Sequence, residues 1–288
     1  MTTYERFSRT TSGAAYSLAI VFTAAIIALL LLVTGYLLYL GGSSMTVALF
    51  TQLPTGYAHN DAHNTIGGMK QAIVGTIFLI GMASIAGVPL GVLTGVYLNE
   101  YAAGGWLATP VRFLCDVLTG VPSIVVGILG YELLVRPLGH YSGYAGALAL
   151  AFIMIPIIAR TTEEMLKLVP QSYREAAIGL GATKAETILK VVLPAAAGPM
   201  VTGVMLAIAR VAGETAPLLF TAAGSRFLTT NPNDPFPSLT VQIYDYVRAD
   251  SHDQNAMGWA GILVLVAMIF VLNMAIRIVV ARRTRIRT

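Results

Sequence analysis

Two oppositely charged residues lie inside a long apolar stretch of this 288-residue chain, and they are the residues best suited to binding chemistry. Arg210 and Glu214 are four residues apart, so on a helix they share one face and can form an ion pair. A charge inside a bilayer costs roughly 2.5–3.5 kcal/mol on insertion scales, and residues that bear this cost are usually functional. A guanidinium also presents a planar fork of donors that fits a tetrahedral oxyanion.

The charged pair has two interpretations. In the simpler one, the two charges only neutralise each other and lock two helices together. In the other, Arg210 binds an anion, while Glu214 holds the guanidinium and competes with the anion for it. The position of the pair within the membrane favours this second interpretation. Thr215 adds a hydroxyl, and Gly213 allows close approach of the backbone. We therefore predict an anion pathway through Arg210, Glu214 and Thr215.

The elements that position this pair are predicted to be membrane helices. Hydrophobic residues make up 56% of the chain and charged residues 11%, with a mean hydropathy of +0.73, whereas soluble domains carry about 25% charged residues. Six stretches are long enough, or nearly so, for the roughly 20 residues that span a bilayer. They cover about 16–40, 71–98, 111–135, 142–160, 196–223 and 257–281. We predict an all-α integral membrane protein whose single transmembrane domain occupies 1–288.

The distribution of basic residues predicts the orientation of these helices, because cytoplasmic loops carry an excess of Lys and Arg. With both termini in the cytoplasm, the basic residues left outside are Lys70, Arg136, Arg226 and Arg248. This orientation places the 161–195 loop in the cytoplasm. The basic tail from Arg282 to Arg287 is predicted to bind anionic membrane lipid, and it is too short to indicate nucleic-acid binding.

Two of the apolar stretches carry signs of special packing. Gly87, Gly91 and Gly95 recur every four residues, a spacing that predicts a tight helix interface within the bundle or with a partner. In the third stretch, Pro122 predicts a break in the helix near the middle of the membrane. A break required only by packing is the simpler interpretation, and a pathway lined by Ser123 is the alternative.

Two segments are predicted outside the membrane. His59, Asp61 and His63 cluster in the first outer loop, but the glycine and asparagine residues around them favour a solvated loop over a metal site. Ser238 to Val247 is amphipathic and predicts a short helix at the membrane interface, available to an extracytoplasmic partner.

A polar segment separates the fourth and fifth apolar stretches. Ser172 and Glu175 have the spacing of a capping box, and so do Thr183 and Glu186, so each pair predicts the start of a short helix. The two predicted helices run over about 173–179 and 184–191. Gly181 lies between them, where a left-handed backbone favours a residue without Cβ.

The same segment contains a specific motif. Three residues separate Glu175, Ala176 and Ala177 from Gly181, and nine more separate Gly181 from the segment 191–194, which reads Val-Val-Leu-Pro. This pattern resembles the EAA signature of ABC import permeases, with valine where the usual form has isoleucine. An ordinary capped connector is the alternative interpretation.

A second resemblance concerns the charged pair itself. Residues 209–221, ARVAGETAPLLFT, resemble the fifth-helix motif of the PstA-type permease of the phosphate-specific ABC importer. Residues 118–125 and 67–76 resemble the same family, and the match covers a core of about 67–281. The residues after Gly-Glu-Thr favour this A-type subunit over its partner permease.

The resemblance implies a subunit of an inner-membrane (plasma-membrane) importer. Its partners would be a second permease of PstC type, a dimer of ATPase subunits and an extracytoplasmic phosphate-binding protein. Glu175, Ala176, Ala177 and Gly181 would dock on the ATPase. ATP and Mg²⁺ bound there would drive alternating access past Arg210 and its equivalent in the partner. The chain itself would hold no cofactor and catalyse nothing, consistent with its lack of a Gly-x-x-x-x-Gly-Lys-Ser/Thr motif.

Three other functions remain as alternatives. An importer of another oxyanion, such as sulfate or molybdate, would share most of these features. Glu214 favours phosphate, because protonated phosphate can donate a hydrogen bond to a carboxylate and sulfate cannot. An intramembrane enzyme is disfavoured because all four histidines lie in predicted outer loops, and a passive channel would not need the EAA-like segment.

Overall fold

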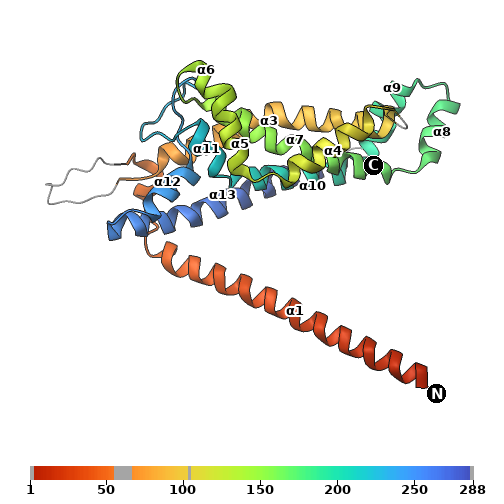
Figure 1. Ribbon diagram of the computed structural model, residues 1–288, viewed down its shortest axis with the longest axis horizontal. Helices are drawn as coiled ribbons and strands as arrows, with labels where there is room; N and C mark the ends of the chain where they lie inside the picture. The colour runs from red at the N-terminus through yellow and green to blue at the C-terminus, as the bar shows by residue number, and fades with distance from the viewer. Residues whose placement is uncertain (1–2, 55–66, 103–104, 286–288) are drawn as a thin grey trace.

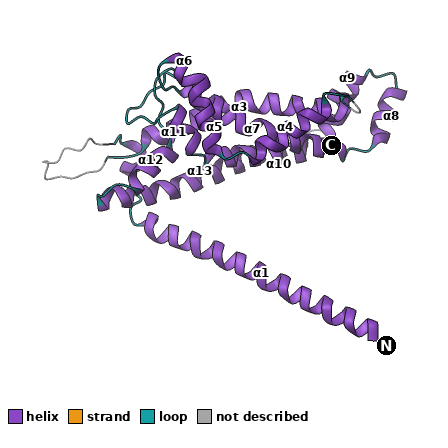
Figure 2. Ribbon diagram, in the orientation of Figure 1, coloured by secondary structure: helices purple, strands orange, loops and turns teal. Residues whose placement is uncertain are grey.

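The computed structural model describes residues 3–54, 67–102 and 105–285. Figure 2 shows helices joined by loops, and no strand, throughout this described part of the chain. Five of its helices are long and apolar enough to cross a membrane, and a sixth span is formed if a bent pair of helices counts as one. The predicted all-helical membrane fold is confirmed.

The first helices in the chain are α1 (Thr3–Gly42), α2 (Val47–Thr51), α3 (Lys70–Val96), the π-helix η1 (Tyr97–Tyr101), α4 (Ala108–Gly120), α5 (Ser123–Gly130), the π-helix η2 (Tyr131–Val135) and α6 (Arg136–Leu138). They are followed by α7 (Gly143–Lys167), α8 (Gln171–Gly179), α9 (Lys184–Thr187), the π-helix η3 (Ile188–Val192), α10 (Leu193–Ala212), α11 (Ala216–Thr221), α12 (Leu239–Val247) and α13 (His252–Arg285).

The helices form an elongated bundle with α7 packed between α3 and α10 (Figure 1). The short helices α8 and α9 lie at one end of the bundle, and α6, α11 and α12 lie at the other. The N-terminal end of α1 and the C-terminal end of α13 lie at the same end as α8 and α9. Helix α1 extends away from the bundle and contacts α13, where the rings of Tyr36 and Trp259 meet edge to face at 5.8 Å.

Helices α3 and α7 pack closely against each other. A Cβ atom added at Gly91 would lie 2.7 Å from the Cβ of Ile158, and one at Gly95 would lie 2.6 Å from the carbonyl oxygen of Ala159. Only glycine allows the two backbones to approach this closely. The tight interface predicted from the glycine spacing is confirmed, and its other side is α7 of the same chain.

Two spans are broken within the bundle. The predicted break at Pro122 is present: α4 ends at Gly120, and the segment that starts at Ser123 is bent from it by 104°. The fifth span was expected to continue over 196–223, but α10 ends at Ala212 and α11 starts at Ala216. The reason is local, because Gly213 is a poor helix former and Pro217 has no N–H to bond the carbonyl of Gly213.

The start of α8 corrects one of the two capping predictions. Helix α8 begins at Gln171 after Pro170, and no side chain caps it. Ser172 therefore lies inside the first turn instead of at the N-cap, and the predicted capping box with Glu175 is absent. Proline explains the difference, because its fixed φ of −57° and missing N–H already suit the position before a helix.

The second capping box is confirmed. The amide of Glu186 donates to Thr183 Oγ1 at 3.3 Å, and the amide of Thr183 donates to Glu186 Oε2 at 3.1 Å. Gly181 has a φ of +87°, the left-handed conformation expected at this turn. The second helix differs from its predicted extent because α9 ends at Thr187 and continues through η3 directly into α10.

Candidate functional site

Arg210 lies in the last turn of α10, immediately before the break in the fifth span. Its Nε atom is 3.8 Å from Glu214 Oε1, which is beyond hydrogen-bond distance. The side chain of Arg210 is 47% exposed in the single chain, whereas that of Glu214 is 15% exposed. The ion pair is therefore loose, and the guanidinium donors remain accessible to an anion.

The other predicted pathway residues flank the two breaks. Thr215 is half-buried at the start of α11, and the backbone oxygen of Glu214 accepts a hydrogen bond from Thr240 Oγ1 at 3.1 Å. Ser123 is the first residue of α5 and is also half-buried. The structure brings the broken spans together through Gly127 of α5, where an added Cβ would lie 3.0 Å from the Cα of Pro217 on α11.

This arrangement is suited to an anion crossing a membrane. Irregular backbone at membrane depth is tolerated where it is buried in protein or lines a cavity, because its polar groups need partners. Transporters use such discontinuous helices to hold substrates near the middle of the bilayer. Here an accessible guanidinium, a carboxylate and a hydroxyl lie within six residues at one break.

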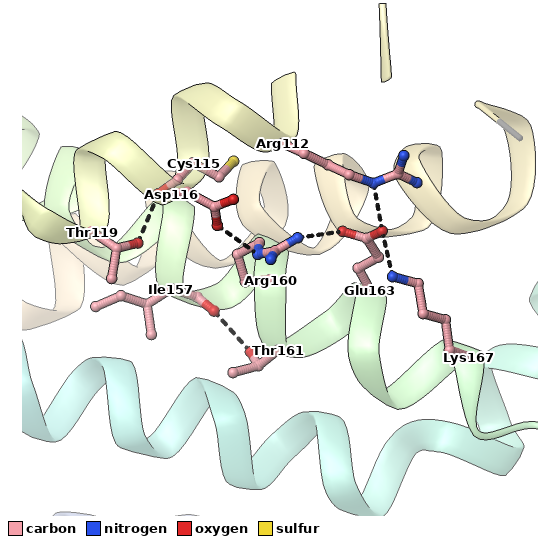
Figure 3. Close-up of polar contacts among 9 residues, drawn as sticks. All are labelled: Arg112, Cys115, Asp116, Thr119, Ile157, Arg160, Thr161, Glu163 and Lys167. Atoms are coloured by element: carbon pink, nitrogen blue, oxygen red, sulfur yellow. Dashed lines mark hydrogen bonds and ion pairs between the residues drawn. The ribbon is translucent and has the colours of Figure 1, made fainter. Parts of the chain in front are cut away.

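Charged side chains form a cluster between α4 and α7 (Figure 3). This cluster was not predicted from the sequence. Glu163 of α7 is fully buried, and its carboxylate accepts from Arg112 Nε at 2.7 Å. Lys167 Nζ lies 2.8 Å from the same carboxylate and Arg160 Nη1 lies 3.3 Å from it. Arg160 in turn pairs with Asp116 of α4 at 2.9 Å. One buried carboxylate thus holds three cations from two helices.

Helical spacing could have indicated this cluster, although not its partners. Arg160, Glu163 and Lys167 follow one another at three and four residues, so they share a face of α7. Arg112 and Asp116 have the same relation on α4. The sequence does not reveal that these two helix faces contact each other. Arg112 and Glu163, which form the contact, are 51 residues apart in the chain.

The EAA-like residues lie on α8 and the turn after it. Glu175 and Ala176 are exposed, Ala177 is buried, and Gly181 forms the turn. A hollow of about 570 Å³ between α8 and the segment α9–η3 is lined by Tyr173, Ala176, Ala177, Leu180, Gly181, Ala182, Glu186, Lys190 and Val191. Leu180 is 90% exposed at its edge. Tyr173 and Ile178 of α8 are exposed as well, and a group of exposed apolar side chains beside a concave surface is typical of a protein docking surface.

At the opposite end of the bundle, the helix predicted over Ser238–Val247 is present as α12, with Ser238 Oγ accepting from the amide of Val241. Burial raises the pKa of Asp245 on this helix, and the nearby Arg226 and Arg248 oppose the shift. His59, Asp61 and His63 lie outside the described residues, as do the side chains from Arg282 onward. The described residues contain no group of three or more His, Cys, Asp or Glu that could hold a metal ion.

Comparison with known proteins connects this architecture to a family. Residues 87–285 match the family described as binding-protein-dependent transport system inner membrane component. The phosphate transport system permease protein PstA of Haemophilus influenzae is 42% identical over 238 residues, which cover 83% of this chain and 82% of that protein. PstA 1 of Mycobacterium tuberculosis is 39% identical over 225 residues, covering 76% of this chain and 73% of that protein.

Solved structures share the fold. A chain of a bacterial alginate ABC transporter, in complex with an alginate pentasaccharide-bound periplasmic protein, matches with a TM-score of 0.65 at 12% identity, covering 98% of both chains. A chain of the inward-facing MetNI methionine ABC transporter matches with a TM-score of 0.55 at 20% identity, covering 76% of this chain and 93% of that one. The chain belongs to the family of binding-protein-dependent transport system inner membrane components and, within it, to the PstA permeases.

Proposed function

We propose that this chain is the permease subunit of an ATP-driven importer that carries inorganic phosphate inward across the plasma (inner) membrane. The observation that carries the proposal is the 42% identity, over most of both chains, to permeases named for phosphate transport. The accessible guanidinium of Arg210 at the break after α10 supports an oxyanion as the substrate. The chain is a transporter subunit and not an enzyme.

The partners follow from the same family relationship. We propose a second permease of PstC type, two ATPase subunits that bind ATP and Mg²⁺, and an extracytoplasmic phosphate-binding protein. The long apolar helices require membrane lipid around them.

We propose that both termini lie in the cytoplasm together with α8 and α9. Two observations support this orientation. The N-terminal end of α1, the C-terminal end of α13 and the α8–α9 segment lie at one end of the bundle (Figure 1). The segment from α8 to η3 at that end carries Arg174, Lys184 and Lys190, and an excess of basic residues favours the cytoplasmic side.

In the proposed mechanism, ATP closes the ATPase dimer, and the dimer moves the segment that contains Glu175, Ala176, Ala177 and Gly181. This movement opens the paired permeases toward the binding protein. Phosphate then passes along the breaks, in contact with Arg210, Glu214, Thr215 and Ser123. Because Arg210 is held only loosely by Glu214, the anion can replace the carboxylate on entry and be replaced by it on release.

Labelled phosphate uptake into liposomes tests this function, using the transporter assembled with its partners and supplied with ATP. We expect ATP-dependent uptake that excess sulfate or molybdate does not suppress. If the intact complex takes up sulfate or molybdate in place of phosphate, the substrate assignment is wrong. Uptake without ATP would instead indicate a passive channel.

We predict that Glu175→Lys uncouples ATP hydrolysis from uptake. If the ATPase presents a cationic group to Glu175, the reversed charge brings two like charges together, which costs several kcal/mol, so uptake per ATP hydrolysed should fall by at least about tenfold. Glu164→Lys, which reverses an exposed charge near the end of α7 outside the docking segment, is the control. Unchanged uptake in an assembled Glu175→Lys complex would refute the coupling assignment.

A further inference from the structure

The docking helix α8 is attached to the rest of the bundle through a buried ion pair. Arg174, immediately before the EAA-like residues, donates through Nη2 to Glu100 Oε1 at 2.7 Å and through Nε to Glu100 Oε2 at 3.3 Å. This is a two-point contact between a guanidinium and a carboxylate, the strongest common geometry for such a pair. Glu100 lies on η1, so the contact joins segments that are 74 residues apart in the chain.

Arg174 also binds the end of α7. Its Nη1 donates to the carbonyl of Val169 at 2.8 Å, and its Nη2 donates to the carbonyl of Leu166 at 3.1 Å. Leu166 lies in the last turn of α7, and Val169 lies two residues beyond the end of this helix. The carbonyl of Leu166 also accepts from the amide of Val169 at 3.3 Å, so Arg174 adds a further hydrogen bond at this carbonyl. One guanidinium therefore connects three elements, namely α8, the end of α7 and η1.

The pair is shielded from solvent, which sets it apart from the exposed ion pairs of the chain. The side chain of Arg174 is 14% exposed and that of Glu100 is 7% exposed. By contrast, the side chains of the Arg136–Glu132 pair are 71% and 48% exposed. Exposed pairs contribute little, whereas removing one partner of a buried pair leaves an uncompensated charge.

A second contact joins η1 to the other short helix of the segment. The ammonium of Lys184, the first residue of α9, lies over the ring of Tyr101 at 4.8 Å from its centroid. Glu100 and Tyr101 are neighbours at the end of η1, so this one element contacts both α8 and α9. A π-helix has a wider turn than an α-helix and is frequent at functional sites.

The element that receives these contacts is continuous with a long membrane helix. Helix α3 runs into η1 without a break, as one candidate span from Lys70 to Tyr101. At Gly91 and Gly95 the backbone of α3 lies so close to α7 that an added Cβ would clash with Ile158 and Ala159. A displacement of η1 would therefore move α3 and α7 together, because a close-packed interface does not deform continuously.

We propose that Glu100 and Arg174 are positioning residues that transmit the movement of α8 to the α3–α7 pair. The proposal rests on the proposed function, since it takes α8 to be the ATPase docking helix. Docking would displace α8, the ion pair would carry the displacement to η1, and α3 with α7 would follow. Without the ion pair, α8 would still bind the ATPase but would move independently of the membrane helices.

The test is a double-mutant cycle in the assembled transporter reconstituted in liposomes. The variants are Glu100→Gln, Arg174→Gln and the double variant, with Glu132→Gln as a control that removes the same charge from an exposed pair. Phosphate uptake and ATP hydrolysis are measured on the same vesicles, and each is divided by the amount of assembled complex. We expect uptake per ATP to fall at least about fivefold in each single variant, the lower end of coupling between linked sites. The double variant should be no worse than Arg174→Gln, because that change alone already removes the ion pair, together with the hydrogen bonds to Val169 and Leu166.

The ratio of uptake to hydrolysis separates transmission from a structural role. Mere loss of stability would reduce the amount of assembled complex and leave the ratio unchanged, and that outcome would overturn the proposal. Additive losses in the double variant would also overturn it. If the unmodified complex takes up no phosphate, the proposed function fails instead. The ion pair is then judged by stimulation of ATP hydrolysis by the binding protein, which the single variants should reduce and Glu132→Gln should not.

Discussion

Replacing Arg210 with glutamine should reduce phosphate uptake by about 10- to 100-fold in the assembled transporter. A hydrogen bond to a charged group is worth about 1.5–3 kcal/mol, and this change removes the charge and most of the donor fork at the break. Hydrolysis of ATP should continue, because Arg210 lies in the last turn of α10, away from the docking helix α8. The measurement is labelled phosphate uptake per assembled complex at several phosphate concentrations.

Two further variants make this result specific. Arg210→Lys keeps the charge but not the planar fork, so its uptake should lie between those of the unmodified chain and Arg210→Gln. Arg136→Gln removes an arginine from an exposed pair that also has four-residue spacing, and it should transport normally. Full uptake by an assembled Arg210→Gln complex would reduce Arg210 to a residue of helix packing.

The second large effect is expected at Glu163. Glu163→Gln preserves the shape of the side chain but leaves Arg112, Arg160 and Lys167 without their shared carboxylate. Removing one partner from a buried ion pair typically costs about 3–5 kcal/mol. We therefore expect α4 to separate from α7 at a markedly lower temperature than in the unmodified chain.

The chain contains its own reporter for this separation. Cys115 is its single cysteine, it lies on α4 between Arg112 and Asp116, and it is buried. Its modification by a thiol reagent on heating, followed on a denaturing gel that separates the subunits, measures when α4 opens. Glu132→Gln is the matched control, because Glu132 belongs to an exposed pair. Identical labelling curves for Glu163→Gln and the unmodified chain would show that the cluster contributes nothing to packing.

The fold was predictable from sequence wherever its cause is local. Apolar length predicts the membrane helices, Pro122 predicts the bend, and Thr183 with Glu186 predicts the start of α9. The prediction that Ser172 is an N-cap was wrong because two local signals compete there. The spacing of Ser172 and Glu175 favours a start at Ser172, but Pro170 is the N-cap and α8 begins at Gln171. The glycine spacing predicted a tight interface but not its partner, because small residues on one helix do not identify the helix they contact.

The candidate site was predictable only where a residue is unusual for its local sequence. Arg210 and Glu214 attract attention because a charge in an apolar stretch is costly. Glu100 and Glu163 lie near the ends of their helices, where charged residues are common, so their types and positions indicated nothing unusual. Their importance comes from burial and from arginines on other elements, Arg174 and Arg112. Contacts of this kind depend on tertiary structure, and one sequence does not contain them.

The contact between α1 and α13 has a consequence for how the chain is made. Tyr36 meets Trp259, which is synthesised roughly 220 residues later, and a Cβ at Gly41 would lie 2.8 Å from the backbone oxygen of the same tryptophan. At about 5–20 residues per second, the ribosome needs about 10 to 45 s to cover that interval. During this time α1 must remain inserted without its protein neighbour, held by its own apolar surface. Docking of α1 is therefore completed only after α13 has left the ribosome.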